Sequence, residues 1–172
     1  MKTFLAFMIL IAFQRLSELL IARRNERTLR SEGAIEYDAP GYKAIVLMHI
    51  AFFISMIAEF FILGRSLNPY WIPLLFIFTA AQIIRYWAIS GLGKHWNTRI
   101  LVVPGAKPVT KGPYKYMRHP NYLAVIIEIA VIPLIFSCYV TAIVFSILNL
   151  ILLRRRITIE ERALGLGSLQ KC

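Results

Sequence analysis

Long apolar stretches alternate with shorter polar ones along the whole chain. A helix needs about 20 mainly apolar residues to cross the hydrocarbon core of a bilayer. Three stretches of this length are followed by a polar segment and then by one much longer apolar stretch. The pattern predicts an all-α integral membrane protein of about five transmembrane helices, at residues 3–22, 44–63, 71–90, 122–136 and 139–153.

The last apolar stretch, residues 122–153, is too long for one ordinary span. As a single helix it would measure about 48 Å, whereas the hydrocarbon core is about 30 Å thick. Pro133 and the neighbouring Ser137 and Cys138 lie near its middle and favour a break. The sequence therefore predicts that the last two helices form a hairpin.

Basic residues are unevenly distributed between the apolar stretches. Five Lys or Arg lie in residues 23–43, six in residues 91–121 and five from residue 154 onward, whereas the other ends carry only Lys2 and Arg65. The positive-inside rule places the three basic segments in the cytoplasm, for instance of a bacterial cell, and the N-terminus outside. Residues 91–121 and the tail, 154–172, then share one membrane face, which independently supports the hairpin.

The composition narrows the possible functions. A chain of 172 residues with 58% hydrophobic residues and a mean hydropathy of +0.63 leaves no room for a separate soluble domain, so we expect one membrane-embedded domain over residues 1–172. The net charge is +11, and the basic residues lie beside the apolar stretches, where they can contact anionic lipid. Nucleic acid is therefore not expected as a partner. Cys138 and Cys172 give no zinc spacing, and no metal is expected.

Several polar residues interrupt the predicted spans. Arg15 and Glu18 lie three residues apart in the first span and are expected to form a structural ion pair. Glu128 lies in the fourth, and an intramembrane carboxylate is a functional candidate by default. It could face the acceptor of a reaction, or it could pair with Arg15 or Arg85.

Two polar segments could carry chemistry. The first contains Lys111-Gly112-Pro113-Tyr114 and then Arg118-His119-Pro120-Asn121-Tyr122, and the second contains Arg156, Glu160 and Glu161. These residues could simply be turns, headgroup anchors and interfacial aromatics. Alternatively, a histidine at a helix N-terminus together with Arg and Glu at helical spacing could bind an anion and a cationic amine.

These two segments together resemble the isoprenylcysteine carboxyl methyltransferase family. The resemblance covers roughly residues 82–164, and it combines the Gly-Pro-Tyr and Arg-His-Pro-Asn-Tyr motifs with the arginine and paired glutamates of the tail. It implies S-adenosylmethionine as the cofactor, bound by the 91–121 loop, the start of the hairpin and the tail. It further implies cofactor-binding roles for Tyr114, His119, Pro120, Asn121, Tyr122 and Glu160, and catalytic roles toward the acceptor for Arg156 and Glu161.

The resemblance also implies a lipophilic acceptor that reaches the site from the bilayer. It could be a prenylated cysteine carboxylate or the acidic hydroxyl of a small lipid, as in the similar bacterial enzymes that methylate alkylpyrones. Glu128 would lie on the acceptor side. Two features depart from the family pattern: the tail after Leu164 has no aromatic residue, and Leu123-Ala124 replaces a common glycine.

Two other functions remain open on the sequence. An intramembrane NADPH-dependent reductase of the sterol or enone type has a similar C-terminal half, and the Lys and Arg of the 91–121 loop could hold its phosphates. A non-enzymatic scaffold or transporter is the third hypothesis, although no internal repeat is visible.

Overall fold

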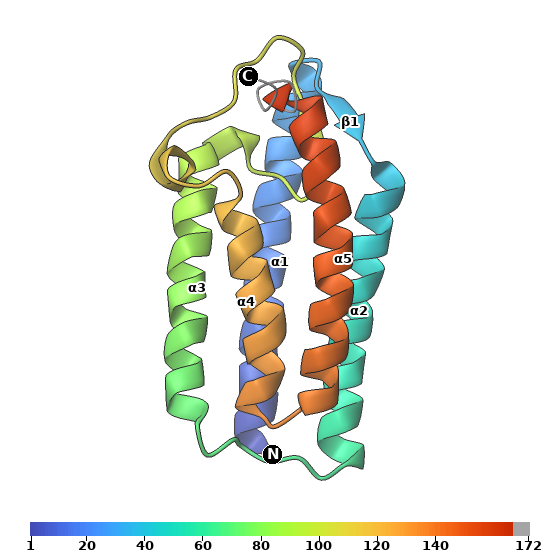
Figure 1. Cartoon of the computed structure of the whole chain (residues 1–172), viewed down its shortest axis with the longest axis vertical. Helices are drawn as coiled ribbons and strands as arrows, with labels where there is room; N and C mark the ends of the chain where they lie inside the picture. The colour runs from blue at the N-terminus through green and yellow to red at the C-terminus, as the bar shows by residue number, and fades with distance from the viewer. Residues whose placement is uncertain (167–172) are drawn as a thin grey trace.

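The computed structural model describes residues 1–166. Within them, five long helices stand side by side along the longest axis of the molecule, and consecutive helices run in opposite directions (Figure 1). They are α1 (Lys2–Ser31), α2 (Ala39–Ile62), α3 (Trp71–Leu92), α4 (Pro120–Ile135) and α5 (Tyr139–Ala163). The tail residues 167–172, which are predicted to be cytoplasmic, lie outside the described residues.

The predicted membrane fold is confirmed in outline. By length and composition, α1, α2 and the segment Trp71–His95 that contains α3 can each cross a membrane. The α4 helix is apolar but has only 16 residues, or about 24 Å. The α5 helix has 25 residues, but three arginines follow its apolar part. The length and composition of the helices therefore support three of the five predicted crossings.

The predicted hairpin between α4 and α5 is present. The chain reverses at Ser137, whose φ of 57° lies in the left-handed region. The Cys138 amide donates to the Pro133 carbonyl at 2.9 Å, which closes the turn. On α2, the Glu59 carboxylate accepts a hydrogen bond from the Thr141 amide at 2.7 Å. This contact satisfies a free amide at the N-terminus of α5 and joins the hairpin to α2.

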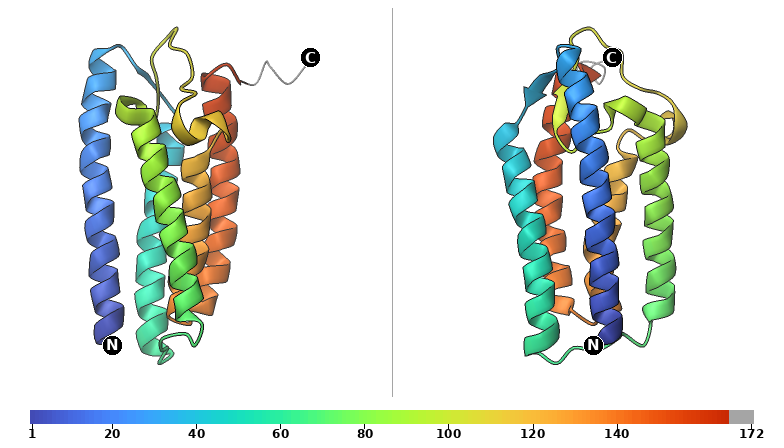
Figure 2. Two further views of the ribbon diagram at one scale, coloured as in Figure 1. Left: turned by 90° about the vertical axis from the view of Figure 1, so that its left-hand side faces the viewer. Right: turned by 180° about the vertical axis from the view of Figure 1, so that it is seen from behind.

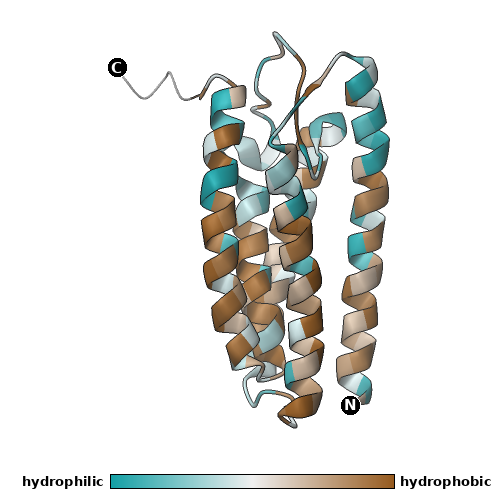
Figure 3. Ribbon diagram, turned by 90° about the vertical axis from the view of Figure 1, so that its right-hand side faces the viewer, coloured by the Kyte–Doolittle hydropathy of each residue, from teal (hydrophilic) through white to brown (hydrophobic). Residues whose placement is uncertain are grey.

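The long connections all lie at one end of the bundle. Residues 32–38, residues 93–119 and the end of α5 meet there, whereas the links 63–70 and 136–138 lie at the other end (Figure 2). Hydrophilic residues gather at the first end, and hydrophobic residues cover most of the helices below it (Figure 3). The three basic segments therefore share one end, as predicted; which side of a membrane this end faces stays a prediction.

A short two-stranded ribbon crosses this polar end. Strand β1 (Ile35–Tyr37) pairs antiparallel with β2 (Ile100–Val102), with Glu36 opposite Leu101. The Arg99 guanidinium lies 4.2 Å above the Tyr42 ring and is also paired with Glu36. The ribbon was not predicted, because three-residue strands separated by more than 60 positions leave no periodic pattern in the sequence.

Three predicted boundaries at the polar end differ clearly from the structure. The predicted first span ended at residue 22, but α1 continues to Ser31, since a polar segment can extend a helix beyond the bilayer. The second span was predicted to begin at residue 44 and the last to end at residue 153, whereas α2 begins at Ala39 and α5 continues to Ala163. Asp38 is the N-cap of α2, since its side chain accepts a hydrogen bond from the Gly41 amide at 3.1 Å.

Helix α1 is attached to the bundle at separate levels and does not pack closely along its length against another long helix (Figure 2). At its foot, the Phe4 ring stacks on Phe60 with centroids 3.9 Å apart and meets Phe136 edge-on at 5.0 Å. At its upper end, Asn25 donates to the Trp96 carbonyl at 2.8 Å.

A buried ion-pair network attaches the middle of α1 to α3 and α4. The Glu128 carboxylate is fully buried and pairs with both Arg15 and Arg85, and Arg85 Nη1 also lies 3.3 Å from Glu18 Oε2. Arg15 Nη1 is 2.8 Å from Glu18 Oε2, so the predicted pair is confirmed. Gln82 donates to Glu128 Oε1 at 2.7 Å. Two arginines and two glutamates compensate one another formally, which suits an apolar environment.

Candidate functional site

A cavity of about 780 Å³ lies inside the polar end of the bundle and extends down between the helices. Its wall is built by α1, α2, the end of α3, the connection 93–119, the start of α4 and α5. Six of the nine predicted site residues belong to this wall: Tyr114, His119, Asn121, Tyr122, Arg156 and Glu160.

The start of α4 and the end of α5 meet through a chain of hydrogen bonds. Arg156 Nε donates to the Tyr122 hydroxyl at 2.8 Å, and this hydroxyl in turn donates to a Glu160 carboxylate oxygen. Arg156 and Glu160 are four positions apart on α5 and so share one face. The two sequence motifs, separated by more than 30 residues, thus form one polar group in the cavity wall.

The guanidinium of Arg156 is held in place from two sides. Besides the bond to Tyr122, its Nη2 donates to the Thr98 carbonyl at 2.7 Å, and the side chain is only 7% exposed. Its third nitrogen, Nη1, has no hydrogen-bond partner within residues 1–166. Arg156 therefore presents a fixed cationic donor to the cavity.

His119 stands at the N-terminus of α4. Its ring stacks on that of Tyr122 with centroids 5.3 Å apart, and its Nε2 lies 3.2 Å from Glu161 Oε1. Arg118 is 3.5 Å from the same carboxylate oxygen. Glu161 is not part of the cavity wall and instead contacts His119. Its predicted catalytic role toward the acceptor stays a prediction.

Two other predicted residues also lie outside the wall. Pro120 is buried at the first turn of α4, where a proline has no hydrogen bond to lose. Glu128 is held by Arg15, Arg85 and Gln82 as described above. The alternative that Glu128 pairs with these arginines is confirmed, and its placement on the acceptor side stays a prediction.

Tyr114 reaches the wall from a short 3-10 helix, η2 (Gly112–Lys115), which packs on the end of α3. The close packing favours glycine at 91, because a Cβ there would lie 3.2 Å from a Pro113 ring carbon. Burial, with a smaller contribution from the Glu160 carboxylate, raises the pKa of Tyr114, so its hydroxyl stays protonated at physiological pH.

Three buried polar atoms in the cavity wall have no hydrogen-bond partner within the described residues. They are Trp96 Nε1, Asn121 Oδ1 and Asn149 Nδ2. Buried polar groups in native proteins are nearly always paired with protein or ordered water, so these three atoms around one cavity are candidate partners for a bound ligand. Trp96 and Asn149 were not predicted. Asn149 has a signal in the sequence, namely a lone amide in an apolar stretch seven positions before Arg156, whereas Trp96 and the Thr98 carbonyl have none.

The lower part of the cavity has an apolar side formed by α1 and α2. Leu19, Val46 and Ile50 line it and are also 38%, 38% and 52% exposed on the bundle. Within residues 1–166, no neighbouring helix covers these apolar side chains, and we interpret the space between α1 and α2 as a lateral opening of the cavity. This opening lies where α1 is not packed closely on α2.

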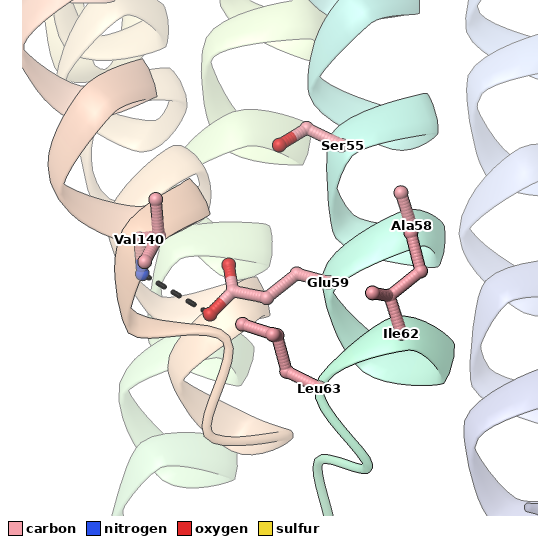
Figure 4. Close-up of a pocket in the computed structure, with 6 residues that line it drawn as sticks. All are labelled: Ser55, Ala58, Glu59, Ile62, Leu63 and Val140. Atoms are coloured by element: carbon pink, nitrogen blue, oxygen red, sulfur yellow. Dashed lines mark hydrogen bonds between the residues drawn. The ribbon is translucent and has the colours of Figure 1, made fainter.

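A smaller pocket of about 210 Å³ lies at the opposite end, lined by α2 and the start of α5 (Figure 4). Its one acidic group, Glu59, already accepts hydrogen bonds from the Val140 and Thr141 amides and pairs with Arg65 at 3.1 Å. It therefore offers no candidate chemistry.

The part of the chain that matches a known protein family contains most of the residues that line the cavity. The model of the isoprenylcysteine carboxyl methyltransferase (ICMT) family matches residues 72–165. A Bacillus subtilis strain 168 protein named Uncharacterized protein YpbQ is 47% identical over 161 residues, 92% of this chain and 96% of that protein. An Uncharacterized protein of Haemophilus influenzae is 30% identical over 152 residues, 88% of each chain. No solved structure matches. The matched region contains the motifs, α4 and α5, and the chain belongs to the isoprenylcysteine carboxyl methyltransferase family of membrane methyltransferases.

Proposed function

We propose that this protein transfers a methyl group from S-adenosylmethionine to an oxygen of a lipophilic acceptor. The observation that carries the proposal is the junction of the two motifs in one wall, Arg156–Tyr122–Glu160, beside a cavity that opens sideways between α1 and α2. Family membership supports methyl transfer and gives no support to the alternative of an NADPH-dependent reductase.

The residues of the upper cavity fit the cofactor. When bound, S-adenosylmethionine supplies a methyl group activated on a sulfonium, next to a cationic amine and a ribose. Glu160 offers a carboxylate for the amine or the ribose hydroxyls, and the unpaired Asn121 Oδ1 and Trp96 Nε1 offer one acceptor and one donor. The stacked rings of His119 and Tyr122 provide an aromatic face, which favours a nearby cation.

Arg156 is suited to hold the acceptor oxygen. The bonds to Tyr122 and Thr98 fix the guanidinium plane and leave Nη1 for an anionic oxygen. A carboxylate or an acidic enol is already ionised at neutral pH, so the protein needs no strong base and mainly aligns the two reactants. Glu161 orients His119 in this proposal.

The acceptor that this geometry favours is a small free lipid with an acidic hydroxyl, such as an alkylpyrone. Its alkyl chain would leave through the apolar opening formed by Leu19, Val46 and Ile50 and remain in the bilayer. A prenylated cysteine carboxylate is the other acceptor class that the family implies. We place the site at the cytoplasmic face, since the basic segments surround it.

The test is a methyl-transfer assay with purified protein, labelled S-adenosylmethionine and two acceptors, an alkyl-4-hydroxy-2-pyrone and a farnesylcysteine. Base treatment separates the products, because a methyl ester releases methanol and a methyl ether does not. We expect base-stable label in the pyrone with the wild type and a loss with Glu160→Gln. Label in neither acceptor, or oxidation of NADPH by the protein, would refute the proposal.

A further inference from the structure

The lower end of the cavity contains two polar side chains that neither the proposed methyl transfer nor the ion-pair network of Arg15, Glu18, Arg85 and Glu128 uses. His49 on α2 and Asn149 on α5 both line the cavity, below the level of Arg156. Asn149 is seven residues before Arg156 on the same face of α5, which places it about 10.5 Å further along the helix axis. The rest of the wall includes apolar side chains such as Phe53 and Val125. It also includes three members of the ion-pair network described above, whose charges are paired with one another or with Glu128: Arg15, Glu18 and Arg85.

The packing of α2 on α5 brings the two side chains to one level. These helices are antiparallel, with Ser55 Oγ 3.0 Å from Thr141 Oγ1 and the Phe52 and Phe145 rings 5.6 Å apart. The second contact pair lies three residues earlier on α2 and four residues later on α5 than the first pair. The same step from the rings leads to His49 and Asn149. They therefore lie across from each other on the cavity wall.

The two side chains offer complementary hydrogen-bonding atoms. His49 Nδ1 lies 2.8 Å from the Ile45 carbonyl, which can only accept, so this nitrogen carries the proton. In the neutral ring, Nε2 is then an acceptor, and it has no partner among residues 1–166. Asn149 is only 2% exposed, and its Nδ2 donor has no partner among the described residues. A buried, unpaired donor is costly unless a ligand accepts its hydrogen bond.

One small group satisfies both atoms. A hydroxyl donates to an imidazole nitrogen and accepts from an amide at the same time, whereas a carbonyl can only accept and a methylene can do neither. We propose that His49 and Asn149 form a second recognition point for the acceptor, which binds a hydroxyl on its chain about two helical turns below the oxygen that is methylated.

This inference rests on the proposed methyl transfer and narrows the acceptor class. It selects an acceptor with two oxygen groups, an acidic one beside Arg156 and a neutral hydroxyl further down the chain. Beside an unmodified isoprenoid or alkyl chain, Asn149 could pair only with a trapped water. The family match begins at residue 72, so α2 and His49 lie outside it. The selectivity would therefore combine a residue inside the matched region with one outside it.

The test uses an alkyl-4-hydroxy-2-pyrone and a series of the same compound with a single hydroxyl at successive chain positions. We expect the wild type to prefer one position in this series, with a kcat/KM about tenfold or more above that of the plain chain. In Asn149→Leu and His49→Phe the ratio between these two acceptors should fall toward one. Met48→Leu, a core change beside His49 outside the cavity wall, is the matched control and should keep the wild-type ratio.

Binding of the same compounds to the protein loaded with S-adenosylhomocysteine, measured by calorimetry, gives a second readout that does not need turnover. The inference is overturned if the wild type methylates all members of the series equally, or if Asn149→Leu keeps the preference. If the wild type methylates farnesylcysteine but no pyrone of the series, this inference fails and the proposed methyl transfer stands. If it methylates neither farnesylcysteine nor any pyrone, the proposed function itself fails, which is a different result from equal methylation.

Discussion

At the scale of single residues, Arg156 has the most constrained side chain of the site. Two of its nitrogens are committed to Tyr122 and Thr98, and one is left for the cavity. A guanidinium can bind three groups in one plane, whereas an ammonium is a flexible point charge without that geometry. The arginine is therefore needed both for its charge and for its shape.

We expect Arg156→Ala to lower kcat/KM for the acceptor by about 100-fold or more, the usual cost of removing a preorganised donor at a reacting oxygen. Arg156→Lys should recover little of this loss, because the three donors of an ammonium lie on one nitrogen and do not reproduce the planar arrangement in which Arg156 contacts Tyr122, Thr98 and the acceptor. The measurement is methyl transfer into lipid at saturating cofactor. Arg154→Ala, an exposed arginine on the same helix, is the control and should retain activity. An Arg156→Lys variant with wild-type kinetics would contradict this role.

The residues that were predicted and those that were missed differ in how they reach the site. His119, Tyr122 and Glu160 were predicted because each belongs to a compact motif at the end of a helix. Trp96 and the Thr98 carbonyl were missed because the fold of an irregular connection brings them to the cavity. A backbone carbonyl has no identity in a sequence, so no pattern could have indicated Thr98.

At the scale of elements, the ribbon of β1 and β2 joins the upper part of α1–α2 to the 93–119 connection. Arg99 is its centre, since it pairs with Glu26 at 3.4 Å and with Glu36, and covers Tyr42. Although partial burial acts the other way, hydrogen bonds from Arg30 and Arg99 lower the pKa of Glu36. The ion pairs of Glu36 therefore persist at and above the pH at which a free glutamate ionises. They weaken only when the pH falls through the lowered pKa of Glu36.

Replacing Arg99 with Met should loosen the ribbon and leave the bundle intact. We expect faster hydrogen exchange of the amides of residues 100–102 with unchanged protection of α3, measured by mass spectrometry in detergent. The wild type should show the same local change when the pH is lowered through the folded-state pKa of Glu36. Arg24→Met, an exposed arginine on α1, is the control. Equal exchange in the Arg99 variant and the wild type would show that the strands hold without it.

The elements themselves were predictable to different degrees. The hairpin followed from two independent facts, the length of the apolar stretch and the charge on both sides of it. The helix boundaries near the polar end were less predictable, because α1 continues for nine residues beyond its predicted end at residue 22. Hydropathy marks the edge of the bilayer and not the end of the helix.

At the scale of the whole molecule, the buried network of Arg15, Glu18, Arg85 and Glu128 holds three helices together in the apolar region. Glu128→Gln would leave one positive charge uncompensated there. We expect a loss of about 3–5 kcal/mol of stability, seen as a lower midpoint of thermal unfolding in detergent. Glu32→Gln, which breaks a surface pair with Lys94, should change the midpoint little. An unchanged midpoint for Glu128→Gln would contradict a structural role and favour a role toward the acceptor.

The charge asymmetry of the two ends predicts the orientation of the molecule in a cell membrane. In a Cys172→Ser background, a cysteine at Lys107 should react with a membrane-impermeant maleimide only after the cells are opened, and one at Ser66 should react in intact cells. The remaining native cysteine, Cys138, is buried. The reverse labelling pattern would place the site on the outer face.

Because of the side opening between α1 and α2, the acceptor concentration that determines the rate is its concentration in the membrane. An acceptor that arrives from the bilayer is presented at a surface density, so its apparent KM should follow its mole fraction among the lipids and not the amount added per volume of buffer. Diluting a fixed amount of acceptor into more vesicles would then slow turnover even though the bulk concentration is constant. The chains of detergents or host lipids would compete for the same apolar passage, so measured rates should depend on what the protein is dissolved in.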